Sequence, residues 1–295
     1  MEKIMNSPKT GLIKLGDLAV ELGDLVLAVD CYSKVLNRVN ASDGSDLRNK
    51  KTIMELKEKM DQLNVEESNA FPILYAENWK LSKSSFVKGT QCAKYLFLDT
   101  FKRNEKTPPS KETLVVFERG HRFEDTFREK MFPGGINVKD DVGVTAYYKS
   151  YTNYLLYQES VSTIYEATVI EDDVLVMCDV LVKDNNGMID IYECKSSLAI
   201  NDAIKNDLAI QYTVCKKRFG RKLKSFNLVL ATEDGNWTVT DMKSELENQI
   251  AGTKKLIAAF KNVISKSEPD IPMGNQCESP YRCEFIEYCT KNIKQ

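Results

Sequence analysis

The sequence predicts an α/β protein in which a mixed sheet is flanked by helices. Three successive runs rich in β-branched residues, at 162–170, 174–183 and 188–196, are separated by acidic and Asn-Gly turn signals. A helical run at 202–219 follows them, and a further strand is expected at 225–231. A β-β-β-α-β order with additional helices on either side is typical of a sheet covered on both faces.

Composition limits the classes of protein to be considered. The 295 residues are 42% hydrophobic and 28% charged, enough for one sizeable core and a smaller appended domain. A net charge of −2 excludes a surface that is basic all over, so a nucleic acid would have to meet a local basic patch. We find no secretory leader and no apolar run long enough to cross a membrane, and we therefore expect a cytoplasmic protein.

The first part of the chain, residues 1–75, is predicted to be a separate all-helical segment. A helical pair carries Gly16 where the two helices would approach closely and Tyr32 as the large residue beside it, and a third helix is expected at 47–63. This segment resembles one tetratricopeptide-type repeat. It is either a cap for the larger domain at 76–295 or a site where residues 1–63 bind a protein partner.

Three further helices are expected in the larger domain. One covers residues 83–98 and contains Cys92, and a second covers 113–131, where Pro133 and the glycines after it end the helix. A third, long helix is predicted at about 240–266. These helices would cover the faces of the sheet.

A pair of acidic residues on neighbouring strands is the strongest catalytic signal. If residues 185–187 form the hairpin loop with Gly187 in the left-handed conformation, Asp179 lies directly opposite Glu193. Their Cβ atoms would be roughly 5 Å apart, close enough for both carboxylates to hold one divalent cation. Lys195 would point to the same face. A two-residue turn would place the acids on opposite faces, and an ordinary salt-bridged strand pair is the alternative.

Two more carboxylates favour a metal site. A tight turn at Asp172 and Asp173 would place Glu166 across from Asp179, and Glu124 lies in the predicted helix at 113–131. A helix carboxylate beside a strand aspartate and a strand Glu-x-Lys would complete a site for Mg2+ or Mn2+.

Together these residues resemble the PD-(D/E)XK superfamily, and within it the RecB-like nucleases with cysteine-held clusters, including CRISPR-associated exonucleases. The matching stretches are residues 120–124, 179–181, 193–195 and 211–212, and the resemblance covers roughly residues 81–289. It implies a restriction-endonuclease-like sheet in which Asp179 and Glu193 bind the metal and Lys195 positions the attacking water. It also implies that Gln211 and Tyr212 contact the substrate strand, Gln211 as part of the catalytic set.

The chain departs from that family at two positions. Many relatives have a histidine where this chain has Glu124, and the only histidine, His121, lies directly after the helix glycine. Glu124 is acceptable as a metal ligand. The tyrosine usually found four residues after the glutamine is replaced by Cys215.

The cysteines indicate a second site. Cys277, Cys283 and Cys289 are spaced C-x5-C-x5-C, too loosely for the usual zinc knuckle, and the resemblance supplies Cys92 as the fourth ligand. Four thiolates would satisfy a [4Fe–4S] cluster; a structural Zn2+ or unliganded core cysteines are the alternatives. The other four are predicted to be buried small hydrophobes: Cys31, Cys178, Cys194 and Cys215.

The densest basic run, at 216–224, follows Gln211 and is expected to border the acidic site. Its proposed DNA contacts are Lys216, Lys217, Arg218 and Arg221. The alternative is that this run is only a solvent-exposed charged face.

The sequence therefore predicts a metal-dependent deoxyribonuclease, an exonuclease acting on linear or single-stranded ends. The alternative is a catalytically silent nucleic-acid-binding or scaffolding protein with a structural metal site.

Overall fold

The computed structural model describes residues 9–41, 47–69 and 71–293. It divides into two compact units, the first formed by Met1–Asn78 with Ile136–Ala167 and the second by Trp79–Gly135 with Thr168–Gln295. The first unit is thus larger than the predicted segment 1–75. The addition has a local cause, because a Cβ atom on Gly11 would lie 2.5 Å from the carbonyl oxygen of Gly143, so these two backbones are in close contact.

The first unit is mainly helical. Its helices are α2 (Lys9–Glu21), α3 (Leu25–Ala41), α4 (Leu47–Asp61), α8 (Val138–Val142) and α9 (Tyr148–Tyr157). A Cβ atom on Gly16 would lie 2.5 Å from the ring of Tyr32, whose hydroxyl donates to Asp17 over 2.6 Å. The close approach of α2 and α3 at Gly16 is therefore confirmed. The polar stretch at 42–46 that precedes the third helix lies outside the described residues.

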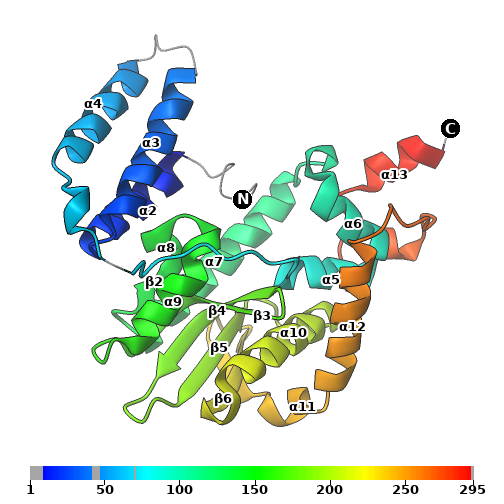
Figure 1. Cartoon of the computed structure of the whole chain (residues 1–295). Helices are drawn as coiled ribbons and strands as arrows, with labels where there is room; N and C mark the ends of the chain where they lie inside the picture. The colour runs from blue at the N-terminus through cyan, green and yellow to red at the C-terminus, as the bar shows by residue number, and fades with distance from the viewer. Residues whose placement is uncertain (1–8, 42–46, 70, 294–295) are drawn as a thin grey trace. The chain divides into compact units, whose positions relative to one another are not determined.

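Seven strands of the described chain form one mixed sheet (Figure 1). They are β1 (Leu81–Ser82), β2 (Ile136–Asn137), β3 (Thr163–Glu171), β4 (Val174–Lys183), β5 (Ile189–Lys195), β6 (Leu223–Ala231) and β7 (Trp237–Asp241). The order is β2-β3-β4-β5-β6-β7, with β1 beside β4. The β4–β5 and β6–β7 pairs are antiparallel, whereas β5 and β6 are parallel. The predicted mixed α/β architecture is confirmed.

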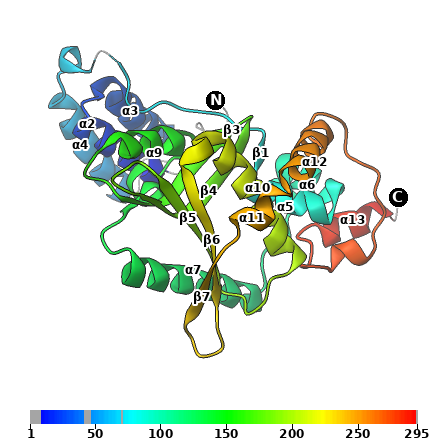
Figure 2. The ribbon, with the colours of Figure 1, turned by 90° about the horizontal axis from the view of Figure 1, so that it is seen from below.

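In the second unit, helices cover both faces of the sheet (Figure 2). On one face lies α7 (Lys111–Met131), whose buried Phe127 packs against Tyr192 and Trp237 with ring centroids 6.0 and 5.4 Å away. On the other lies α10 (Asp202–Phe219), held by the edge-to-face contact of Tyr212 with Phe226. These two helices position the side chains of the site.

The register of the β4–β5 hairpin agrees with the prediction. Gly187 has a φ of 71°, and the amide of Asp184 donates to the carbonyl of Met188 over 2.9 Å, which closes a three-residue loop at 185–187. Val180 consequently pairs with Tyr192, and Lys183 with Ile189. Asp172 and Asp173 also have positive φ, as a tight two-residue turn requires.

Two predicted helices are interrupted. The first divides into α5 (Lys83–Gln91) and α6 (Ala93–Phe101), because Cys92 is extended, with φ −161° and ψ 125°. The long helix predicted at 240–266 begins instead as β7, whose β-branched residues pair with β6, and continues as α11 (Lys243–Glu247) and α12 (Ile250–Val263). The described chain ends in α13 (Ile286–Ile293), and within the described ranges no helix has the length and apolar character to cross a bilayer.

Candidate active site and cysteine centre

Asp179 and Glu193 lie on the same face of the β4–β5 hairpin. One step beyond the Val180–Tyr192 pair, the register places the two acids opposite each other. The amide of Cys194 donates to Asp179 Oδ2 over 2.7 Å, and Glu193 is only 1% exposed. The predicted juxtaposition of the two acids is therefore present.

Helix α7 brings a third acid to this hairpin. Arg128 forms an ion pair with Glu124 and donates to the backbone carbonyl of Asp179 over 2.9 Å. Burial raises the pKa of Asp179 well above its ordinary value, and the charges of Glu193 and Glu124 raise it further. A buried carboxyl group beside two others is stabilised by a cation, and this is the chemical situation in which oxygen ligands hold Mg2+ or Mn2+.

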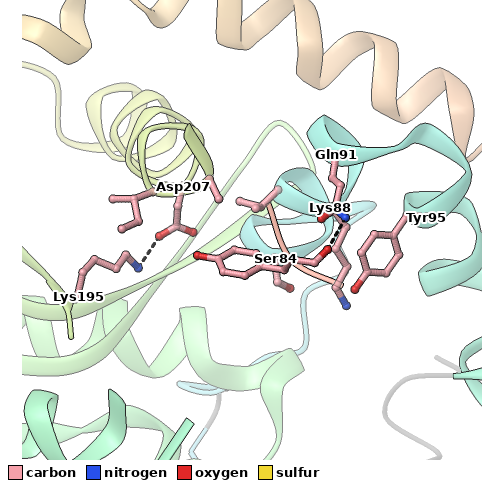
Figure 3. Close-up of a pocket in the computed structure, with 10 residues that line it drawn as sticks. Ser84, Lys88, Gln91, Tyr95, Lys195 and Asp207 are labelled. Atoms are coloured by element: carbon pink, nitrogen blue, oxygen red, sulfur yellow. Dashed lines mark hydrogen bonds and ion pairs between the residues drawn. The ribbon is translucent and has the colours of Figure 1, made fainter. Parts of the chain in front are cut away.

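Beside these acids, two lysines and two carboxylates alternate around a closed ring. Lys195 Nζ lies 2.6 Å from Glu193 Oε1 and 2.7 Å from Asp207 Oδ2, the contact marked in Figure 3. Lys83 Nζ lies 2.7 Å from the same Glu193 oxygen and 3.5 Å from Asp207 Oδ2. We call these four residues the lysine–carboxylate ring. They come from α5, β5 and α10.

The charges of the ring stabilise one another. Burial alone would raise the pKa of Asp207, but Lys195 and Lys83 lower it to about 2. Burial opposes the charged form of both lysines, yet Asp207 and Glu193 raise the pKa of Lys83 and of Lys195 above the ordinary value. These shifts keep Asp207, Lys83 and Lys195 in their charged forms at neutral pH.

The side chain of Gln211 is hydrogen-bonded to Glu193. It is fully buried; its Nε2 donates to Glu193 Oε2 over 2.8 Å, and its Oε1 accepts from Lys83 over 2.7 Å. This places Gln211 in contact with a proposed metal ligand, with both ends of its amide occupied. The neighbouring Tyr212 is 0% exposed, and its hydroxyl donates to Glu247. The burial of Tyr212 argues against the substrate contact predicted for it.

The acidic cluster has the donor chemistry of a divalent cation site, although Glu193 is already engaged. Its two oxygens accept from Lys83, Lys195 and Gln211. No group of three or more His, Cys, Asp or Glu residues in the described part of the chain is arranged as a ready-made metal site. A cation that uses Glu193 Oε1 would therefore replace lysine contacts.

Glu166 and His121 are the other two residues singled out in the sequence. Glu166 belongs to the first unit, where Lys139 Nζ lies 4.0 Å from its carboxylate. Its φ of 53° is a left-handed conformation that is unusual for a non-glycine residue. His121 is exposed on α7.

A cavity of about 320 Å³ adjoins the lysine–carboxylate ring. Lys195 and Asp207 form one end of it, and α5 contributes Ser84, Lys88 and Gln91 (Figure 3). Tyr95 and Tyr281 are the aromatic residues of its lining. The cavity has room for a small organic group beside the acids.

The basic run at 216–224 ends away from this site, whereas the prediction placed the run beside it. Leu223 pairs with Ile189 at the start of β5, whereas Lys195 is at its end and pairs with Leu230. Six residues of strand separate the two positions, roughly 20 Å. The reason is topological: β5 and β6 are parallel, so α10 must return the chain to the opposite end of the sheet.

Part of this run is also paired with acids. Lys216 lies 3.2 Å from Glu247, and Lys217 forms an ion pair with Asp172. Arg221 is exposed, in the short 3-10 turn after α10. The run is a separate basic surface of the second unit.

The four cysteines predicted as ligands line one small cavity of about 20 Å³. Cys92 enters it from the extended link between α5 and α6, and the residues that share its lining include Lys94, Leu98 and Ile271. The amide of Phe285 donates to Cys283 Sγ over 3.5 Å. Four cysteines around one largely apolar cavity have the ligand chemistry for a thiophilic metal or an iron–sulfur cluster, although in the described chain they are not arranged as a ready-made metal site.

Burial and the neighbouring sulfurs raise the pKa of two of these thiols. Desolvation raises the pKa of Cys283 to about 11, and the pKa of Cys289 is raised for the same reason. Lys94, which opposes the rise at Cys289, lies 3.2 Å from Glu268.

The segment that carries the late cysteines is joined to α5 and α6 by several bonds. Gln91 Nε2 donates to the carbonyls of Gln276 and Tyr281, each over 2.7 Å. Tyr95 donates to Glu284 over 2.9 Å and packs edge-to-face on Phe285. These contacts bring the two ends of the second unit together.

The remaining cysteines largely match the prediction. Cys31, Cys178 and Cys215 are buried, and the sulfurs of the last two are 3.6 Å apart. Cys194 is only half-buried and lies next to the acids.

No protein-family model matches this chain, and no curated protein is significantly similar to it in sequence. The functional argument therefore rests on the fold and the two centres. Sequence reasoning missed two members of the ring. Asp207 could have been found because it lies four residues before Gln211 on one helix face, whereas nothing near Lys83 indicates its role.

Proposed function

We propose that this chain is a divalent-metal-dependent deoxyribonuclease of the PD-(D/E)XK, RecB-like type, acting as an exonuclease on linear or single-stranded ends. The observation that supports this is the convergence of Asp179, Glu193 and Glu124 with Lys195 beside a cavity. Buried carboxylates that repel one another destabilise a fold, and a reaction that needs a cation is a reason to retain them.

Asp179 and Glu193 would hold the metal, with Glu124 as a third acid. Mg2+ or Mn2+ bound there would lower the pKa of a water molecule and neutralise the charge that develops on the phosphate. Lys195, held between Glu193 and Asp207, would orient the attacking water or a phosphate oxygen. The adjoining cavity would take the nucleotide next to the scissile bond.

For the cysteines we propose a [4Fe–4S] cluster held by Cys92, Cys277, Cys283 and Cys289, with Zn2+ as the alternative. The C-x5-C-x5-C spacing favours the cluster. The cavity of about 20 Å³ favours a single ion. The metal content of the purified protein decides between them.

One observation favours the rival function, a catalytically silent nucleic-acid-binding or scaffolding protein. Lys83, Lys195 and Gln211 satisfy Glu193 without any metal, as they would in a purely structural site. In either case the tetratricopeptide-like first unit is proposed to bind a protein partner through residues 1–63.

A cleavage assay distinguishes the two functions. Wild-type protein is incubated with labelled linear double-stranded, circular and single-stranded DNA, with Mn2+, with Mg2+ or with a chelator. We expect metal-dependent release of short products from linear and single-stranded DNA and none from circles. Binding without cleavage in every metal would refute the nuclease and favour the rival.

The basic run is predicted to matter only for long substrates. Arg218→Glu with Arg221→Glu should weaken binding of an oligonucleotide of about twenty nucleotides and flatten its salt dependence, because two phosphate contacts are lost. Binding of an oligonucleotide of about four nucleotides should not change, since the end of the run lies roughly 20 Å from Lys195.

Filter binding at several salt concentrations measures both. The matched control for net charge is Lys50→Glu with Lys51→Glu on α4, where both lysines are exposed. Equal losses for long and short oligonucleotides would place the run at the site after all.

A further inference from the structure

The two lysines of the lysine–carboxylate ring already contact Glu193, the carboxylate that the proposed metal needs. Glu193 Oε1 accepts from Lys195 over 2.6 Å and from Lys83 over 2.7 Å, while Gln211 occupies Oε2. A cation that binds Glu193 Oε1 must therefore displace at least one ammonium group, whereas one that binds Oε2 alone would share that oxygen with Gln211. The side chains of Lys83 and Lys195 are only 19% and 23% exposed, so water cannot fully replace the lost partner.

Asp207 is already within reach of both lysines. Its Oδ2 lies 2.7 Å from Lys195 Nζ and 3.5 Å from Lys83 Nζ, and its own side chain is 14% exposed. A short movement of either ammonium group away from Glu193 would leave it paired with Asp207. Asp207 lies on α10, four residues before Gln211, and thus on the helix face that already contacts the site.

We propose that Lys83 competes with the metal for Glu193, and that Asp207 is the positioning residue that receives the displaced lysines. The inference rests on the proposed metal-dependent function. Without metal, Lys83 and Lys195 would pair with Glu193, and metal binding would exchange one set of ion pairs for another. Asp207 would then hold Lys195 in place beside the bound cation.

The exchange predicts opposite effects for two neutral substitutions. In Lys83→Met a competitor for Glu193 is lost, so Mn2+ should bind on the order of tenfold more tightly. In Asp207→Asn the displaced lysines have no second buried carboxylate to pair with, so Mn2+ should bind on the order of tenfold more weakly.

The double variant separates exchange from a simple change in net charge. Two fixed charges acting independently would give additive changes in binding free energy. In the exchange, Asp207→Asn strands two ammonium groups in the wild-type background but only one when Lys83 is methionine. The loss caused by Asp207→Asn should therefore be smaller in the Lys83→Met background.

The experiment is a titration of the full-length protein with Mn2+, without DNA, in which free Mn2+ is followed by electron paramagnetic resonance. Controls are Lys80→Met and Asp202→Asn, which neutralise exposed residues of the same unit and should bind like the wild type. Circular dichroism melts establish that each variant is folded. Lys83→Gln and Asp207→Ser replace any variant that is not, and Asp207→Glu should restore wild-type affinity.

The outcomes separate this inference from the proposed function. The metal site remains, but the exchange is wrong, if Mn2+ binding depends on Asp179 and one of three results is found. Either the two single variants shift the affinity in the same direction, or neither shifts it, or their effects on the binding free energy are additive in the double variant. If the wild type and Asp179→Ala bind Mn2+ equally, the metal site itself is refuted, and the exchange is refuted with it.

Discussion

Asp179→Ala protein should be folded, at least as stable as the wild type in the absence of metal, and inactive. The buried carboxyl group repels Glu193 and Glu124, and its removal relieves that repulsion. The lost hydrogen bond from the amide of Cys194 costs about 1 kcal/mol, which the relief offsets. Cleavage should fall by on the order of 1000-fold or more, because the cation would lose a ligand.

Glu193→Ala should also be inactive, but unlike Asp179→Ala it should be less stable than the wild type. Glu193 accepts from Lys83, Lys195 and Gln211, so its removal leaves buried donors without their acceptor. Breaking one side of a buried ion pair costs roughly 3 kcal/mol or more. The two acids face each other, yet only one of them is expected to be needed by the fold.

Initial cleavage rates and thermal melts with and without Mn2+ test both substitutions. Mn2+ should raise the melting temperature of the wild type and leave that of Asp179→Ala unchanged, because only a protein that binds the ion is stabilised by it. The control is Asp202→Ala, at the exposed first residue of α10, which should keep full activity. Cleavage at the wild-type rate by either acid variant would remove the catalytic role from the hairpin.

The juxtaposition of the acids was predictable because local chemistry sets the register. The Asp184 carboxylate accepts from the amides of Asn186 and Met188 over 2.8 and 2.9 Å, and Gly187 takes the left-handed conformation. These interactions lie within five consecutive residues. A turn defined so locally determines which side chains share a face several residues away.

The lysine–carboxylate ring was not predictable in the same way. Lys83 is 110 residues from Glu193, and their contact depends on how α5 packs against α10 and β4. The position of the basic run was misjudged for a related reason. Proximity of Gln211 and Lys216 in sequence indicated proximity to the site, whereas the parallel β5–β6 pair directs α10 away from it. Likewise, the residues on either side of Cys92, Gln91 and Ala93, do not signal the break in the helix there.

Loss of any one of the four clustered cysteines should remove the metal centre. Cys92 and Cys277 are separated by about 185 residues, so a shared metal group closes a long loop and restricts the unfolded chain. Protein purified without oxygen should be brown, absorb broadly near about 400 nm and contain about four irons per chain. Each of the alanine variants should be colourless: Cys92→Ala, Cys277→Ala, Cys283→Ala and Cys289→Ala.

These variants should also melt at least about 10 °C lower, since closing a loop of this length contributes on the order of 4 to 5 kcal/mol. Part of the attachment should survive, because Gln91 and Tyr95 still hold the segment that contains Glu284. Cys31→Ala and Cys215→Ala are matched controls, being buried and outside the cavity, and should keep both colour and iron.

Colourless anaerobic protein with one zinc per chain would refute the cluster but retain the four-cysteine site. Retention of metal by Cys92→Ala would remove Cys92 from the ligand set, because the centre would then be built from the late cysteines alone.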